Sequence, residues 1–524
     1  MSLVKRIFNT AGPCNRQDHY IIDPLRRLGA EIMELIDQKA YFVIHSARQT
    51  GKTTLLKELT RQVNAAGKYH AVYCTLETAQ TAATAEVGIP IIINAIYWAV
   101  KNYNLPNARL IKDNTDTDDI YNTLQMTLSA YCRSLDKPLV IFFDEADCLS
   151  VETLIPFLRQ LRSGYVNRPE FPFIHSLALT GMRNIRDYRD EYRLPEKTLG
   201  SSSPFNIITE SMTLRNFSQC EIGELYQQHA DDTGQEFSKD AIELVWEQTQ
   251  GQPWLVNAIA YEAVRKKSED EAAETITADK VTSVIQTLIL KRDTHFDSLI
   301  ARLHEDRVRR VIEPIIIGKE AATYRYSDDY SYVKDLGLIR DDRGIVEPAN
   351  PIYTEIIIRS LNWDTQVEIE QTGTLYQMPR YLQNGTIDMD CLLSDFQVFW
   401  RENLDIWRKK YDYQEAAPQL ILQAFLQRIL NGGGQIVREL AAAAGRVDLC
   451  VIYNNKKYPV EMKIRYNDEV YSEGTEQIIR YMDILGCNIG WLVVFDQRVT
   501  LTWSERIFCR KTVSNGKTIM IFGY

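Results

Sequence analysis

The sequence predicts an α/β protein made of several domains, and three features of the chain lead to this prediction. Its 524 residues exceed what one hydrophobic core supports, so three or four domains of roughly 150 residues are expected. Apolar runs that end in polar residues recur in the first 180 residues, as buried strands of a parallel sheet do. A second series of apolar runs, broken by turns and one helical segment, follows residue 434.

Composition and charge exclude several classes of protein. No apolar stretch is long enough to span a bilayer, and the first twenty residues contain no apolar signal core, so a cytoplasmic protein without a membrane partner is expected. The nine cysteines form no CxxC pair and the seven histidines no HxxxH, which argues against a zinc site. The net charge of −10 argues against coating of nucleic acid by bulk attraction. Residues 385–524 are neutral, with 17 Lys+Arg and 17 Asp+Glu, and therefore tolerate a polyanion better.

The first apolar run spans residues 41–44, and the motif of a phosphate-binding loop follows it. The segment HSARQTGKTTLL (45–56) has the spacing G-x-x-x-x-G-K-[ST], with a serine in place of the first glycine. The glycine brings the backbone N–H groups close to the phosphates, the lysine reaches the β and γ oxygens, and the threonine hydroxyl binds Mg²⁺. The alternative is a strand, turn and helix with a chance GKTT. The nucleotide-binding residues expected along this loop are Ser46, Arg48, Gln49, Thr50, Gly51, Lys52, Thr53 and Thr54.

Two later strands add acidic and hydroxyl groups. PLVIFFDEAD (138–147) is an apolar run that ends in Asp144, expected to hold Mg²⁺ through water, and Glu145, expected to polarise the attacking water. SLALTGMRN (176–184) ends near Thr180, a candidate sensor of the γ-phosphate. Arg183 or Arg186 would then reach the nucleotide of a neighbouring subunit, and the sequence does not choose between them.

These motifs, with the opening FNTAGPCN…HYIIDPLRRL and TQGQPW further on, resemble the AAA-like ATPases related to the STAND class over about residues 1–280. The resemblance implies a P-loop ATPase core at 1–212 and a helical lid at 213–290, with ATP and Mg²⁺ as cofactors. It implies that Tyr20, Pro24 and Pro253 lie near the adenine. It also implies a homo-oligomer, since such enzymes donate an arginine across the subunit interface.

The middle of the chain combines helices with a short hairpin. Residues 291–365 resemble a winged helix, whose functional interpretation is DNA docking. The candidate recognition helix, SDDYSYVKDLG, carries three aspartates and one lysine, so a contact between domains or subunits is the favoured alternative. Residues 366–410 are expected to be a linker.

The C-terminal residues, 411–524, carry a second set of chemical groups. The predicted strand in GRVDLCVIYNN contains Asp448, and the next, KKYPVEMKIRY, contains Glu461 and Lys463. Alternation along a strand sends Glu461 and Lys463 to the same face, and the neighbouring strand brings Asp448 beside them. Two carboxylates would hold Mg²⁺ or Mn²⁺, and Lys463 would position or deprotonate the water. The alternative is an ion pair at a sheet edge.

The order of elements in this region resembles the core of the PD-(D/E)XK nuclease superfamily, a restriction-endonuclease-like α/β domain. The resemblance implies an extra acid on the first helix, Glu415, with Glu439 as its competitor. Gln477 and Tyr481, four residues apart on the helix EGTEQIIRYMDILG, would touch the metal or the phosphate.

The function expected from both halves is an ATP-regulated, metal-dependent nuclease. The usual substrates of the superfamily are the only reason to favour DNA over RNA. Fusions of this kind suggest a setting in prokaryotic defence or mobile-element processing. The alternative is a non-catalytic DNA-binding or scaffolding ATPase whose nuclease-like domain only binds. A regulatory switch acting through the winged helix is a third possibility, and an unseen activator stays open.

Overall fold

The structure is a computed structural model of the chain. Contacts divide it into two compact units. Unit 1 is Met1–His295 with Ala321–Tyr353, and unit 2 is Phe296–Glu320 with Thr354–Tyr524. No described helix is long and apolar enough to cross a membrane. The structure describes residues 6–29, 32–113, 118–181, 207–265, 274–291, 294–316, 327–342, 345–357, 359–361, 381–383, 385–410, 418, 421–423, 425–426, 435–437, 449–454, 456–465, 470–496 and 502–524.

Unit 1 is built on a parallel sheet with the strand order β2-β3-β4-β1-β5. Its strands are β1 (Tyr41–His45), β2 (His70–Thr75), β3 (Leu139–Asp144), β4 (Ser176–Gly181) and β5 (Ile208–Thr213). The predicted α/β fold with a parallel central sheet is confirmed. The strands run parallel and β4 lies between β1 and β3. The carboxyl ends of these three neighbouring strands therefore lie at the same edge of the sheet, where ligands bind in such folds.

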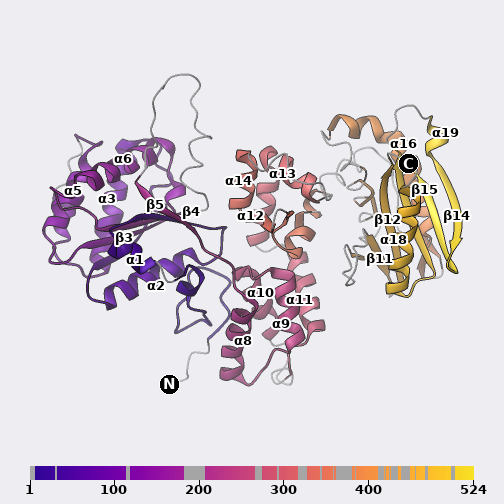
Figure 1. The fold of residues 1–524 in the computed structure, drawn as a ribbon, viewed down its shortest axis with the longest axis horizontal. Coiled ribbons are helices and arrows are strands. Elements are labelled where there is room, and N and C mark those ends of the chain that lie inside the picture. The colour runs from indigo at the N-terminus through magenta and orange to yellow at the C-terminus, as the bar shows by residue number, and fades with distance from the viewer. Residues whose placement is uncertain are drawn as a thin grey trace. The chain divides into compact units, whose positions relative to one another are not determined.

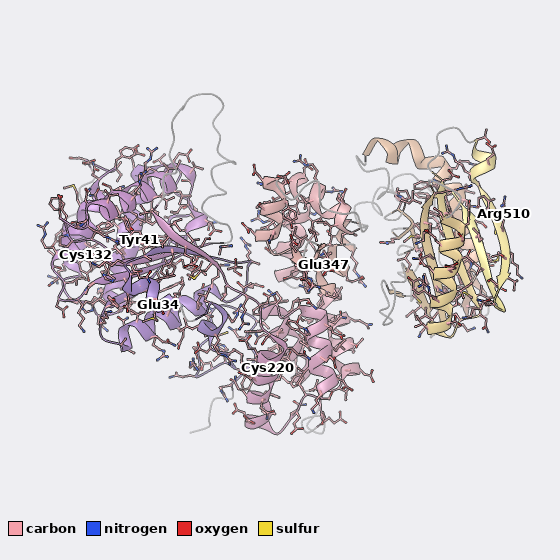
Figure 2. All side chains as sticks on the ribbon, viewed as in Figure 1. Glu34, Tyr41, Cys132, Cys220, Glu347 and Arg510 are labelled. Atoms are coloured by element: carbon pink, nitrogen blue, oxygen red, sulfur yellow. The ribbon has the colours of Figure 1, made fainter. Side chains whose placement is uncertain are left out.

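Helices cover both faces of this sheet. Figure 1 shows α1 (Ile32–Asp37) and α2 (Lys52–Ala65) on one side, and α3 (Ala85–Asn102), α5 (Thr123–Arg133) and α6 (Val151–Asn167) on the other. Alternate residues of β1 enter the two cores, so that Phe42 packs with α2 and Tyr41 with α3 and α6. Tyr41, labelled in Figure 2, is fully buried and donates a hydrogen bond to the Ile174 carbonyl at 2.9 Å. Shorter elements are η1 (Pro24–Arg27), η2 (Glu77–Ala79), α4 (Arg109–Asp113) and η3 (Ala146–Cys148).

A helical group follows the sheet in unit 1. Where the sequence predicts amphipathic helices, the described part of the chain has α8 (Gln219–Thr233), α9 (Lys239–Thr249), α10 (Pro253–Val264) and α11 (Ala278–Lys291). A capping box between Ser218 and Glu221 starts α8, and Gly234 ends it in the left-handed conformation at φ +77°. Pro253 occupies the first turn of α10, where its missing N–H costs nothing.

The last part of unit 1 is α14 (Asp328–Asp335) and an antiparallel hairpin of β6 (Ile339–Asp342) and β7 (Ile345–Pro348). Gly337, at φ +74°, lies directly against the phosphate loop, because a Cβ there would stand 2.4 Å from the Cβ of Ala47. Arg340 hydrogen-bonds to Gln250 and forms an ion pair with Glu347 at 2.6 Å. The helices α12 (Thr294–Leu303) and α13 (Asp306–Ile316) lie at the border of unit 2 and inside it, and the winged-helix arrangement stays a prediction.

Unit 2 contains a mixed sheet with the order β10-β11-β12-β13-β15-β14. Its strands are β10 (Gln435–Val437), β11 (Leu449–Tyr453), β12 (Lys456–Arg465), β13 (Ile489–Asp496), β14 (Phe508–Ser514) and β15 (Lys517–Gly523). β11 pairs antiparallel with both β10 and β12, while β12, β13 and β15 run parallel. The remaining elements are β8 (Leu382–Gln383), β9 (Thr386–Ile387), α16 (Met389–Lys410), α18 (Val470–Leu485) and α19 (Trp503–Arg506).

The helix α16, at Met389–Lys410, takes the place of the second half of the linker expected at 366–410. Phe396 and Phe399 of this helix are fully buried in the core on one face of the sheet, opposite to the face that α18 covers. The Trp491 indole donates to the Asp390 carboxylate at 2.7 Å, and the Tyr524 hydroxyl to the Leu393 carbonyl at 2.8 Å. Apolar residues spaced three and four apart from Met389 onward form the buried stripe, while the polar segment before them suggests a linker.

Candidate functional site

Asp144 is the centre of a hydrogen-bond cluster at the carboxyl edge of the unit 1 sheet. Its side chain is 1% exposed at the end of β3. One carboxylate oxygen accepts from the Thr53 hydroxyl at 2.6 Å and from the Tyr73 hydroxyl at 3.1 Å. The other accepts from the Thr180 hydroxyl at 2.5 Å and from the backbone N–H of Glu145 at 3.1 Å. The fold thus brings together the predicted residues Thr53, Asp144 and Thr180 from α2, β3 and β4.

Lys52 starts α2 and turns its amine back into the phosphate loop. The Nζ donates to the carbonyls of Ser46 at 2.7 Å and of Ala47 at 2.8 Å. Burial lowers the pKa of Lys52 to about 8, and the nearby charges of Asp147 and Asp144 oppose this shift. A phosphate oxygen is a better acceptor for this enclosed ammonium than two neutral carbonyls, because the bond is charge-assisted on both sides.

Ser46 occupies the position of the usual first glycine without disturbing the loop. Its side chain is 5% exposed, and its Oγ lies 2.8 Å from Thr50 Oγ1 and 3.2 Å from the Leu214 carbonyl. The residues of the loop in the left-handed conformation are Gln49, at φ +57°, and Gly51, at φ +92°. The positive φ values therefore fall at Gln49 and Gly51 and not at Ser46, which instead ties the loop to the segment after β5.

Glu145 combines an unusual backbone with a shifted pKa. It follows β3 at φ +57°, a conformation that few residues other than glycine adopt. Its Oε2 accepts a hydrogen bond from the Thr75 hydroxyl at 3.3 Å. Burial, together with the charge of Asp144, raises the pKa of Glu145. Strained carboxylates with raised pKa values are characteristic of acid–base sites.

The remaining predicted residues of this site lie around the same loop. Arg48 and Gln49 are exposed, whereas the Thr54 hydroxyl accepts from the backbone N–H of Cys14 at 3.0 Å. Pro253 is buried at the start of α10. Arg183 and Arg186 lie outside the described residues.

Arg27 is a residue of this region that sequence reasoning missed. It is 4% exposed and donates from Nη1 to the Thr50 carbonyl and from Nε to the Arg215 carbonyl, each at 2.7 Å. Burial lowers its pKa to about 9. The sequence around Arg27, DPLRRL, gives no signal of this role. The Thr50 and Arg215 carbonyls belong to segments that only the fold brings together.

In unit 2 the predicted pair Glu461 and Lys463 lies on β12, on the face that α18 covers. The Lys463 Nζ lies 2.7 Å from Glu461 Oε1, and the Glu461 side chain is 1% exposed. A Cβ built on Gly474 of α18 would stand 3.3 Å from the Lys463 Cγ, so the helix passes close over the pair. Asp448, Glu415 and Glu439 lie outside the described residues.

Two helix residues and one ion pair complete this face. Tyr481 is buried in the core between α18 and the sheet, and the Gln477 Oε1 is buried without a hydrogen-bond partner. Arg465, two residues after Lys463, pairs with Asp496 at 3.2 Å and with the Tyr471 hydroxyl at 3.0 Å. Among the residues that the structure describes, no three acidic, cysteine or histidine side chains are grouped to hold a metal ion.

Comparison with known families decides the class of the first unit. Residues 19–357 match the model of a family described as an AAA-like domain. The chain belongs to this AAA-like family. Residues 397–498 match a second model, described as a domain of unknown function, DUF8371. The AAA-like match covers the phosphate loop, the Asp144 cluster and α10, which supports an ATPase-like role for this part of the chain.

Comparison with solved structures finds partial likenesses at low identity, while no curated protein matches the sequence. The Walker-type ATPase PABY2304 of Pyrococcus abyssi is 12% identical with a TM-score of 0.45, over 67% of this chain and 99% of that chain. The Thermotoga maritima RuvB Holliday junction branch migration motor is 14% identical with a TM-score of 0.33, over 63% and 95%. Cdc6p from Pyrobaculum aerophilum is 15% identical with a TM-score of 0.33, over 61% and 88%.

Proposed function

We propose that the AAA-like unit binds and hydrolyses ATP. We further propose that this cycle regulates a metal-dependent nuclease in unit 2. The nuclease cuts phosphodiester bonds and prefers DNA to RNA. The single observation that carries the ATPase half is the cluster around Asp144. A buried carboxylate surrounded by the Thr53 and Thr180 hydroxyls, next to the Lys52 amine, has the composition of a nucleotide–metal site.

Each residue of this cluster has a role in hydrolysis. The Thr53 hydroxyl and the Asp144 carboxylate would hold Mg²⁺, which when bound neutralises charge on the phosphate oxygens. The Lys52 ammonium exchanges its two carbonyl partners for β and γ oxygens. Glu145 orients the attacking water and accepts its proton, and its raised pKa makes it a stronger base than an ordinary glutamate.

The nuclease half rests on the pair Glu461 and Lys463. Burying the Glu461 carboxylate is costly even with the half-buried Lys463 beside it, so such a pair points to a chemical role rather than to stability. Leu449 pairs with Val460, and Asp448 directly precedes Leu449 as Glu461 directly follows Val460. Asp448 is the second carboxylate that the sequence predicts for this site. The two carboxylates would hold Mg²⁺ or Mn²⁺, and Lys463 would position the water that attacks phosphorus.

A cleavage assay with matched variants tests both halves. Plasmid, linear and single-stranded DNA are incubated with the full chain and Mg²⁺ or Mn²⁺, with and without ATP. Lys463→Ala should abolish cutting, whereas Lys456→Ala, an exposed lysine on the same strand, should not. Lys52→Ala should abolish ATP hydrolysis and the response of cutting to ATP.

The outcome also separates the alternative function. Intact ATP hydrolysis with no cutting of any substrate, together with DNA binding that Lys463→Ala does not change, favours a scaffolding ATPase with a binding module. Absence of ATP hydrolysis in the wild-type chain contradicts the first half of the proposal.

A further inference from the structure

The last hairpin of unit 2 is basic in a chain that is acidic overall. Residues 507–524, which include β14 and β15, contain Arg510, Lys511 and Lys517 but no aspartate or glutamate, whereas the whole chain has a net charge of −10. Lys517 forms an ion pair with Asp483 at 2.5 Å. Arg510 and Lys511 are exposed, and neither has an ion-pair partner among the residues that the structure describes. Two uncompensated cations on one exposed strand favour a negatively charged partner.

Arg510 lies at one end of a line of guanidinium groups and aromatic rings. Its guanidinium carbon lies 4.7 Å from the centre of the Phe508 ring, and the Phe508 ring centre lies 6.4 Å from that of Tyr471. The Arg465 guanidinium lies 4.7 Å from the Tyr471 ring centre and donates to the Tyr471 hydroxyl at 3.0 Å. Burial raises the pKa of Tyr471, while the charges of Arg465 and Arg510 oppose this shift. These four residues are called the arginine–aromatic strip below.

The strip lies on the face of the sheet that carries the proposed nuclease pair. Lys463 on β12 is the partner of Val494 on β13, and Val494 is the partner of Gly523 on β15. Phe508 on β14 is the other partner of Gly523. Val494 is buried against α18, so this row of residues faces α18. A Cβ on Gly523 would stand 2.3 Å from a carbon of the Phe508 ring, which therefore lies directly over this glycine.

The row also sets the distance between the strip and the nuclease pair. The strand order β12-β13-β15-β14 puts three strand spacings between Lys463 and Phe508. At about 4.8 Å for each spacing the two residues are about 14 Å apart, which a few nucleotides span. A strand bound at the strip can therefore continue to the pair of Glu461 and Lys463.

The strip is accessible and its chemistry suits a nucleobase. β14 is the last strand in the described sheet order, and Arg510, labelled in Figure 2, is exposed on it. One face of its guanidinium lies against Phe508, and the exposure of the side chain leaves the opposite face to solvent. Phe508 and Tyr471 are half-buried, so the fold fixes their positions. A guanidinium plane held on an aromatic ring is a surface on which a base stacks, and its charge attracts the phosphates on either side.

We propose that the arginine–aromatic strip binds an unpaired nucleic-acid strand next to Glu461 and Lys463, with a nucleobase stacked on Arg510. This inference rests on the nuclease proposed above, and it names the substrate class as single-stranded or frayed ends rather than fully paired duplex. In a duplex the bases already stack on one another, so their faces are not available to Arg510. Because every base has such a face, the strip binds without preference for sequence.

Fluorescence anisotropy of a labelled single-stranded oligodeoxynucleotide of about 12 nucleotides, titrated with the full chain in EDTA to prevent cutting, tests this inference. The wild type should bind the single strand about tenfold more tightly than the duplex of the same sequence. Arg510→Ala should weaken binding of the single strand about tenfold, as expected for the loss of one stacked base. Arg510→Lys, which keeps the charge but not the planar group, should recover little of this loss.

Lys511→Ala is the matched control, because it removes the same charge from the neighbouring residue, which alternation along β14 puts on the other face of the sheet. It should change the affinity by less than about threefold. Equal weakening by Arg510→Ala and Lys511→Ala, or full recovery by Arg510→Lys, would overturn the proposal, since charge alone would then explain binding. Wild-type binding of the duplex as tightly as the single strand would overturn it too.

Cleavage of the same single strand with Mg²⁺ separates this inference from the nuclease itself. Cutting by the wild type that Arg510→Ala leaves unchanged, with the strand well below saturation, would overturn the strip and leave the nuclease in place. Binding that depends on Arg510, without any cutting, would overturn the nuclease and leave the strip as a binding site. Absence of both binding and cutting would overturn both.

Discussion

Replacing Thr180 by valine should damage the Asp144 cluster by a predictable amount. Valine has nearly the same shape as threonine but lacks the hydroxyl that donates to Asp144 at 2.5 Å. A hydrogen bond to a charged group contributes about 1.5–3 kcal/mol, and Asp144 keeps its donors Thr53, Tyr73 and the Glu145 N–H. We therefore expect the free energy of unfolding to fall by about 2 kcal/mol, and the melting temperature of unit 1 by about 3 °C.

Thermal unfolding and ATP turnover measure the two effects in parallel. Thr60→Val is the matched control, because the Thr60 hydroxyl is equally buried but donates to a neutral acceptor, the Leu56 carbonyl, at 2.7 Å. Its cost should be about 1 kcal/mol or less, with unchanged turnover. Thr180→Val should lower kcat about tenfold or more, because the same hydroxyl is proposed to face the γ-phosphate. Thr180→Ser, which retains a hydroxyl, should keep most of the wild-type stability and most of the wild-type kcat.

A Thr180→Val chain that melts with the wild type and hydrolyses ATP at the wild-type rate would refute this reasoning, since the hydroxyl would then neither hold Asp144 nor touch the nucleotide. Equal losses in the Thr60 and Thr180 variants would show that the charge of Asp144 adds nothing to the hydrogen bond.

Three further variants test other parts of the two sites. Glu145→Gln should lower ATP turnover about a hundredfold while ADP still binds. Because the pKa of Glu145 is raised, this base takes up a proton at a higher pH than an ordinary glutamate does. As the pH is lowered, the wild-type kcat should therefore begin to fall before the pH reaches the usual glutamate pKa of about 4.3. Ser46→Gly should lower the free energy of unfolding by about 1 kcal/mol, from the lost contact with the Leu214 carbonyl and the added backbone freedom, with little change in ADP affinity. Mg²⁺ should raise the melting temperature of the wild-type unit 2, and Glu461→Gln should remove this rise.

Each of these expectations has a contradicting result. Turnover by Glu145→Gln at the wild-type rate would exclude Glu145 as the base. A tenfold gain in ADP affinity for Ser46→Gly would mean that the serine obstructs the loop. An equal effect of Mg²⁺ on the wild type and on Glu461→Gln would place the metal elsewhere.

The sequence by itself predicts the elements of unit 1 and the chemistry at their ends. Apolar runs show where strands are buried, and the polar residue that ends each run marks the edge where ligands bind. Lys52, Thr53 and Asp144 could be found in this way because their motifs are local. The helices α8 to α11 were also predictable, since caps such as Ser218 and the Gly-Gln-Pro turn before α10 act on neighbouring residues only.

Unit 2 shows where local signals fail. The strands β11 and β12 and the helix α18 were expected from alternation, helical spacing and turns, and they bring Glu461, Lys463 and the helix together. The helix α16 was not expected, because a polar segment precedes it and its buried stripe has meaning only against the sheet that it covers. The pair Arg465 and Asp496 likewise joins two strands whose parallel register no local pattern reveals.

Only the tertiary structure decided how distant groups meet. The position of β4 between β1 and β3 makes Thr180 a partner of Asp144, and the register of β2 with β3 brings in Tyr73. The contacts of Arg27, and the one that joins Tyr471 to Phe508, became visible in the same way, since no local pattern shows which of these residues meet. The physical reason is that hydrogen bonding and burial depend on contacts between segments far apart in the chain, whereas caps, turns and amphipathic periods depend on residues a few positions away.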